Sequence, residues 1–102
     1  VAMTNDKGYW SHKHDYPIEE VWNTYRVLAR EIVLRLQAFK VLDKHGYPAI
    51  GMKDMRQWNA TIQKMIDAFE LLKYSSSYTE GENRIIEEGL ELFCKYYRNL
   101  WD

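Results

Sequence analysis

The C-terminal part of the chain has the clearest hydrophobic pattern. Apolar residues recur there at alternating steps of four and three, at Ile86, Leu90, Phe93, Tyr97 and Leu100. On a helix with 3.6 residues per turn, this spacing places the five side chains in one stripe. Thr79 and Glu82 precede the stripe at the spacing of a capping box, in which each residue satisfies the other's backbone N–H. The pattern therefore predicts a helix over about 80–101.

Two further apolar stripes with the same period lie upstream. One begins at Met55, where Asp54 and Gln57 resemble a capping pair, and it predicts a helix over about 54–74 that ends before a run of three serines. The other predicts a helix over about 17–43. Pro17 fits its first position, where a missing N–H costs nothing. Gly46, which can adopt the left-handed conformation, and Pro48 mark the stop.

These three helices indicate the fold class. Loops of roughly ten and five residues suit an up-down-up bundle, and 102 residues suit one domain. Residues 1–16 show neither a helical nor a strand period, so we expect an irregular N-terminal arm. The prediction is an all-α protein, a small three-helix bundle over residues 17–102 that follows this arm.

Two features of the helices need an explanation beyond a simple bundle. Gly89 lies inside the third predicted helix, where glycine costs about 1 kcal/mol relative to alanine. We expect close approach of a neighbouring backbone there, and a tolerated defect is the alternative.

Val27, Leu34 and Val41 repeat every seven residues outside the main stripe of the first helix. Such an extra apolar patch usually marks a partner surface, so we expect a homo-oligomer, unless a thicker bundle covers these residues.

Composition narrows the classes of function. The net charge is −1 and no block of basic residues occurs, so bulk nucleic acid is not an expected partner. No secretory signal and no apolar run long enough for a membrane span are present. The single cysteine, Cys94, cannot form an intrachain disulfide. We therefore expect a cytoplasmic protein without a membrane partner.

The titratable residues form no recognisable catalytic or metal-binding motif. His12, His14 and His45 lack the Cys or carboxylate spacing of zinc sites. Glu19 and Glu20 suit the positive end of the first predicted helix. No glycine-rich phosphate loop and no nucleophile elbow occur. We expect a non-enzymatic protein with no catalytic residues, no metal and no cofactor.

The most unusual charge arrangement is a pair of arginines on the first predicted helix. Arg26 and Arg30 are one turn apart, and neither has an Asp or Glu three or four positions away. Like charges at this spacing repel by a few tenths of a kcal/mol. With Asn23 and Lys40 they trace a polar stripe that can receive an anion such as phosphate through charge-assisted hydrogen bonds. The alternative is that acids from the third helix or from a second subunit neutralise them.

Aromatic residues are the second clue to function. The chain has four Trp, eight Tyr and three Phe, and the helix stripes use only part of them. Flat rings beside guanidinium groups suit a nucleotide, because a ring stacks on the base while arginines hold the phosphate. The competing explanation is that these rings seal bundle ends or subunit contacts. The candidate ligand-binding residues are Arg26, Arg30, Asn23, Tyr9, Trp10, His14 and Tyr47.

The segment from Gly89 to Asp102 matches the pattern GLxLFxKYYxxLWD. Together with residues 36–40, 46–48 and 58–70, it resembles a group of small helical proteins encoded by tailed bacteriophages. The resemblance covers about residues 15–102, and it implies a viral protein of the host cell cytoplasm without transferring an active site.

Some small oligomeric phage proteins sequester nucleotide immune signals. By analogy with them, we expect a non-enzymatic protein that binds and sequesters a small nucleotide-type ligand in an anti-defence role. The first alternative is a protein–protein interaction module that inhibits a host protein or serves phage assembly. A hydrolase with an unusual carboxylate site is a third interpretation.

Overall fold

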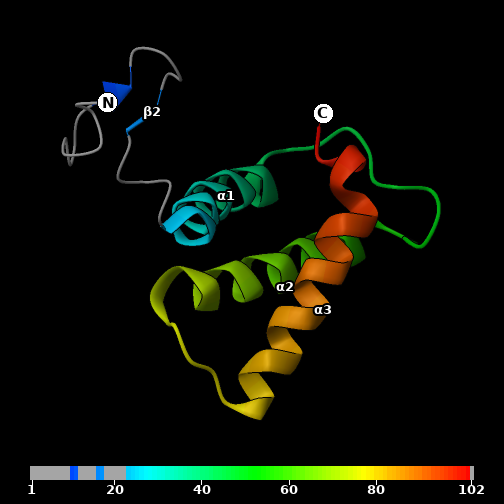
Figure 1. Cartoon of the computed structure of the whole chain (residues 1–102). Coiled ribbons are helices and arrows are strands. Elements are labelled where there is room, and N and C mark those ends of the chain that lie inside the picture. The colour runs from blue at the N-terminus through cyan, green and yellow to red at the C-terminus, as the bar shows by residue number, and fades with distance from the viewer. Residues whose placement is uncertain (1–9, 12–15, 18–22, 102) are drawn as a thin grey trace.

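The computed structural model describes residues 10–11, 16–17 and 23–101. The described chain forms three helices, of which α2 packs against both α1 and α3 (Figure 1). The elements are β1 (Trp10–Ser11), β2 (Tyr16–Pro17), α1 (Thr24–Val41), α2 (Met55–Tyr74), α3 (Glu80–Tyr96) and the 3₁₀ turn η3 (Tyr97–Asn99). The predicted all-α three-helix bundle is confirmed.

The start of the first helix differs from the prediction. Pro17 belongs to β2 and lies opposite Trp10 in a short antiparallel pair, so the helix does not begin at Pro17. Proline suits the edge of an extended ladder as well as a helix start, and it pushes the preceding residue, Tyr16, toward extended backbone. Of the predicted arm over 1–16, the structure describes only Trp10–Ser11 and Tyr16, and these are paired as strands.

Two helix ends also differ from the prediction. α1 ends at Val41, because Leu42 is extended and its N–H closes the last turn onto Ala38 and Phe39. α3 ends at Tyr96 and tightens into η3, so Leu100 and Trp101 lie outside the helix. A last turn of 3₁₀ geometry is common at helix ends and is not encoded by an apolar period.

Side chains cap α2 and α3 as the sequence predicts. The N–H of Glu82 donates to Thr79 Oγ1 at 3.1 Å, and the N–H of Thr79 donates to Glu82 Oε1 at 2.8 Å. At α2, the N–H of Gln57 donates to Asp54 Oδ1 at 2.8 Å. The Gln57 side chain instead accepts from the N–H of Lys53, at 2.7 Å. The capping box of α3 is thus complete.

The Thr79→Ala variant is expected to lower the free energy of unfolding by about 1 kcal/mol, because the N–H of Glu82 loses its acceptor. Thr79→Ser keeps the hydroxyl and is expected to retain most of the stability. Chemical denaturation followed by circular dichroism measures both. Equal denaturation midpoints for the alanine and serine variants would contradict a stabilising role of this cap.

The hydrophobic core is centred on α2. α1 packs on one side of this helix and α3 on another, whereas α1 and α3 hardly touch each other within the described residues. The indole of Trp58 meets the rings of Phe39 and Tyr96 edge to face, with centroid distances of 6.4 and 5.6 Å. The largest fully buried side chains are Trp58, Ile62, Met65 and Val33.

Glycine allows the closest contact between α2 and α3. A Cβ added at Gly89 would lie 2.2 Å from the Cβ of Ala68 and 2.7 Å from the carbonyl oxygen of Lys64. The predicted close approach of a neighbouring backbone at Gly89 is confirmed.

The left-handed glycine of the α1–α2 connection is Gly51, with φ 92°, and not Gly46.

None of the helices in the described part of the chain is both long and apolar enough to cross a membrane.

Candidate functional site

The candidate anion site lies at the start of α1. Asn23 precedes the helix and is exposed, Arg26 is half-buried, and Arg30 is exposed. The ion pairs that the structure gives for residues 23–101 join other side chains, so neither guanidinium has a carboxylate partner within that range. The alternative that acids of α3 neutralise the two arginines is not seen in the protomer.

Arg26 has an unused hydrogen-bond donor. Its Nε is shielded from solvent and has no acceptor among the described residues. Its Cζ lies 5.8 Å from the centroid of the Tyr25 ring. A buried N–H without an acceptor costs free energy.

Two tyrosines stand beside Arg26. Burial raises the pKa of the Tyr78 hydroxyl above its ordinary value of 10.0, the Tyr25 hydroxyl raises it further, and the positive charge of Arg26 partly opposes the rise. Tyr78 therefore remains neutral near pH 7, and its hydroxyl donates to the carbonyl of Ser75. Tyr25 is not among the ligand-binding candidates from the sequence, and it is 47% exposed. Its position next to Arg26 in the sequence could have identified it as a neighbour of the candidate anion site.

The structure does not bring Tyr47 to these arginines. It follows the C-terminal end of α1, whereas Arg26 is in the first turn. With a rise of 1.5 Å per residue, the helix from Arg26 to Val41 alone spans about 22 Å. Tyr47 therefore cannot share a mononucleotide with Arg26 in one protomer.

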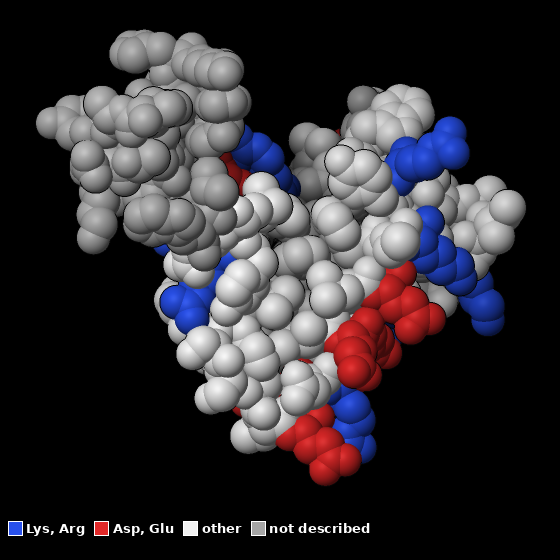
Figure 2. Space-filling view, viewed as in Figure 1, with Lys and Arg blue, Asp and Glu red and all other residues white. Residues whose placement is uncertain are grey.

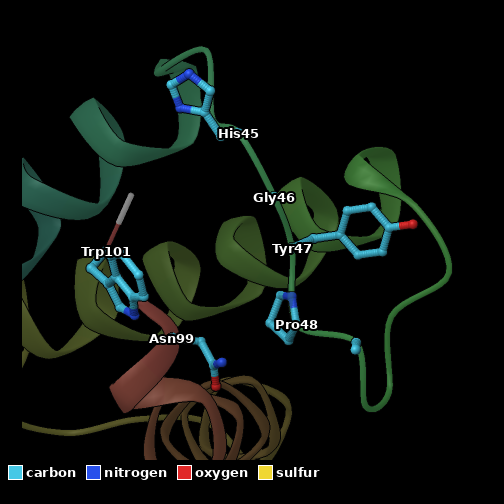
Figure 3. A pocket seen from close by; sticks show the side chains of 7 residues that line it. His45, Gly46, Tyr47, Pro48, Asn99 and Trp101 are labelled. Atoms are coloured by element: carbon cyan, nitrogen blue, oxygen red, sulfur yellow. The ribbon is translucent and has the colours of Figure 1, made fainter.

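Tyr47 instead belongs to a separate pocket of about 380 Å³. Its hydroxyl donates to the carbonyl of Lys53 at 3.0 Å, and Figure 3 shows its ring pointing away from Trp101. The other residues that line the pocket are His45, Gly46, Pro48, Ala49, Asn99 and Trp101.

The other candidate residues fall into two groups. Tyr9 and His14 lie outside the described residues, and of Trp10 only the backbone is described, in β1. Their role in stacking stays a prediction. Lys40 is not available as part of the polar stripe, because its Nζ donates to Gln63 Oε1 at 2.7 Å and thereby ties α1 to α2.

A second candidate site is an apolar groove of about 360 Å³ between α1 and the C-terminal end of α3. We call it the α1–α3 groove. Its rim carries Glu31 and Arg35, which pair with each other at 3.5 Å. Its apolar lining residues are Ile32, Leu36, Phe39, Phe93, Tyr97 and Leu100. The sequence did not predict this groove, because its lining residues recur at the same spacing as residues of a buried core.

Of the seven-residue repeat of α1, Leu34 and Val41 are exposed and Val27 is half-buried. The side chain of Leu34 is 59% exposed and that of Val41 is 82% exposed, so the protomer does not cover these two residues. The expected apolar patch is therefore present for Leu34 and Val41. That a second copy of the chain covers this patch stays a prediction.

Comparison with known proteins assigns no family to this chain. No protein-family model, no curated protein and no solved structure matches the chain. The described residues contain no group of three or more His, Cys, Asp or Glu that could hold a metal ion. The described residues form a small all-α bundle, in which two arginines at the start of α1 have no ion-pair partner among residues 23–101 and an open apolar groove lies between α1 and the C-terminal end of α3.

Proposed function

We propose that this protein is a non-enzymatic binding protein that holds a small nucleotide-type ligand at the start of α1. The observation that carries the proposal is the unpaired state of Arg26 and Arg30 within residues 23–101, together with the Arg26 Nε that lacks an acceptor. Following the resemblance to phage proteins, the ligand would be a defence signal in the host cytoplasm. Sequestration would lower the free concentration of that signal.

The chemistry of the arginines suits phosphate. A guanidinium presents planar N–H donors that match two phosphate oxygens, and hydrogen bonds between charged groups are about twice as strong as neutral ones. Two arginines one turn apart can contact one phosphate or two neighbouring phosphates. Asn23, at the helix start, adds an amide donor beside them.

Aromatic rings near the arginines would hold the base. Tyr25 and Tyr78 are the described candidates, and the arm residues Tyr9, Trp10 and His14 are the candidates from the sequence. The arginines and the asparagine donate hydrogen bonds but do not accept a proton at neutral pH. The residues that would hold the phosphate therefore suit binding without turnover.

Calorimetric titration against a panel of cyclic and linear nucleotides tests this function. We expect binding by the unaltered protein and a loss of at least about 100-fold in affinity for the Arg26→Ala, Arg30→Ala double variant, since each charged hydrogen bond contributes about 1.5–3 kcal/mol. Arg35→Ala is the matched control, because this arginine is on the same helix but pairs with Glu31.

Chromatography of the incubated nucleotide should recover it unchanged. Undiminished affinity in the double variant, or no binding of any nucleotide in the panel, would contradict the proposal. Conversion of the nucleotide to a product would instead favour an enzyme.

The α1–α3 groove favours a second candidate function, a protein-interaction module. Monomeric proteins rarely expose large contiguous apolar patches without a binding role. Beside the groove, Leu28 of α1 is 53% exposed and Tyr97 is 63% exposed. Under this proposal the protein would inhibit a host protein or serve phage assembly, and α1 would also provide a homo-oligomer contact through Leu34 and Val41.

A further inference from the structure

We infer that the pocket beside Tyr47 binds a planar heteroaromatic ring such as a nucleobase, which stacks on the indole of Trp101 and hydrogen-bonds to Asn99. This inference goes beyond the proposed function. We call the site the loop pocket, because residues 45–49 of the α1–α2 connection form much of its lining. It shares no lining residue with the arginine pair or with the α1–α3 groove.

The connection between α1 and α2 is long for a helical bundle. It runs over residues 42–54, between Val41 and Met55, and it contains no helix or strand. Connections longer than about 12 residues without secondary structure are uncommon in compact domains, where they either have a function or lack a fixed conformation. This connection has a fixed conformation, so its length favours a functional role.

Side chains hold the connection in place. At its start, the buried ammonium of Lys44 donates to the carbonyls of Phe39 and Lys40, both at 2.9 Å. Further along, the hydroxyl of Tyr47 donates to the carbonyl of Lys53 at 3.0 Å. The loop side of the pocket is therefore formed before a ligand arrives, which lowers the entropic cost of binding.

Gly51 brings the connection against the C-terminal end of α3. Its φ of 92° lies in the left-handed region, and a Cβ added there would lie 2.2 Å from the hydroxyl oxygen of Tyr96. Glycine is the residue that suits both this backbone conformation and so close an approach. The contact places the connection beside the segment that follows α3, which includes Asn99 and Trp101.

These two residues supply the groups that would contact a ligand. Trp101 is 75% exposed, so most of its ring surface is open. Asn99 is also exposed, and its carboxamide offers both donors and an acceptor. Figure 3 shows Asn99 between Trp101 and Pro48, which all line the pocket. The loop pocket thus combines an open aromatic face with a hydrogen-bonding group next to it.

This combination favours a heteroaromatic ring over an aliphatic ligand. A flat π system stacks on an indole whatever its substituents, as bases do on aromatic side chains. A carboxamide pairs best with a ring edge that carries both a donor and an acceptor, and nucleobases have such edges. The volume of about 380 Å³ lies near the lower end of the range of small-molecule sites, which suits one base with its sugar.

Fixed charges are absent from the lining that the structure describes, which includes no Asp, Glu, Lys or Arg. Figure 2 shows the acidic side chains of α3 along the start and middle of that helix, whereas the loop pocket lies beyond its C-terminal end. We therefore expect weaker binding than at the arginine pair, and an affinity that changes little with salt.

The nucleosides adenosine, guanosine, cytidine and uridine are the probes for this inference, because they carry a base but no phosphate. Calorimetric titration of the full chain should show binding of at least one nucleoside, with similar affinity at low and high salt, and no binding of ribose. Trp101→Ala should weaken this binding by at least about tenfold, because stacking is its main contact.

Three further variants sharpen the result. Trp101→Phe keeps a flat ring and should retain most of the affinity. Asn99→Ala removes the carboxamide and should weaken binding by at least about threefold. Tyr74→Ala is the matched control, because this aromatic residue is 72% exposed but does not line the pocket. It should change nothing.

The outcomes separate this inference from the proposed function. The Arg26→Ala, Arg30→Ala variant should bind the nucleoside as the unaltered protein does, whether or not that protein binds nucleotides at the start of α1. The inference would be overturned if no nucleoside bound, if ribose bound equally well, or if Trp101→Ala kept full affinity. So would a loss of nucleoside binding in the arginine variant, which would place the base at the start of α1.

Discussion

Replacing Trp58 by alanine is expected to lower the free energy of unfolding by about 3–5 kcal/mol. The indole is 1% exposed and bridges Phe39 of α1 to Tyr96 of α3 by edge-to-face contacts. Its removal leaves a cavity where all three helices meet. A domain of this size has about 5–15 kcal/mol of stability in total, so the loss should be plain in urea denaturation followed by circular dichroism.

Trp101→Ala is the matched control for this prediction. It removes the same side chain from a position that is 75% exposed, so we expect a change within about 0.5 kcal/mol. Similar losses for the two tryptophans would contradict the central position of Trp58 in the core.

Gly89→Ala is expected to destabilise the protein by about 2 kcal/mol, although alanine is the better helix former. The new Cβ would lie 2.2 Å from the Cβ of Ala68 and 2.7 Å from the carbonyl oxygen of Lys64. Neither neighbour is the end of a flexible side chain, so α2 and α3 must separate locally. Overpacking typically costs about 1–3 kcal/mol and sometimes more, and approaches this short justify the upper end of that range. A cost of about 3 kcal/mol, less the gain of about 1 kcal/mol from helix propensity, leaves the expected net loss.

Gly81→Ala distinguishes packing from propensity in the same helix. A Cβ at Gly81 would approach only Thr79 Oγ1, at 4.0 Å, so this change should raise stability by about 0.5–1 kcal/mol. Thermal or chemical denaturation of the two variants should therefore shift in opposite directions. A gain in stability for both would show that the helices can move apart freely at Gly89.

The two candidate sites both involve α1, one of the two helices that flank the central helix α2. Its buried residues are Ala29, Val33 and Leu36, whereas α2 buries residues along its length. α1 thus presents its arginines at one end and a groove wall on one flank. Binding elements are commonly drawn from the less tightly packed parts of a fold.

The candidate site was only partly predictable. Arg26 and Arg30 could be identified because the absence of an acid one turn away is a property of local sequence. The partner of a side chain on another helix could not be predicted from the local sequence. Lys40 fits the same polar stripe, but Gln63 of α2 accepts its hydrogen bond. Tyr47 is an aromatic loop residue like those of the arm, but the length of α1 separates it from the arginines.

The sequence by itself determined the three helices and the capping box of Thr79 and Glu82, and it indicated a close neighbour at Gly89. These features depend on residues within one or two turns of each other, so the local pattern contains the information. Only the tertiary structure decided that the seam between α1 and α3 stays open. Ile32, Phe39 and Phe93 have the same period whether a seam is closed or open, because the angles between helices depend on contacts between distant residues.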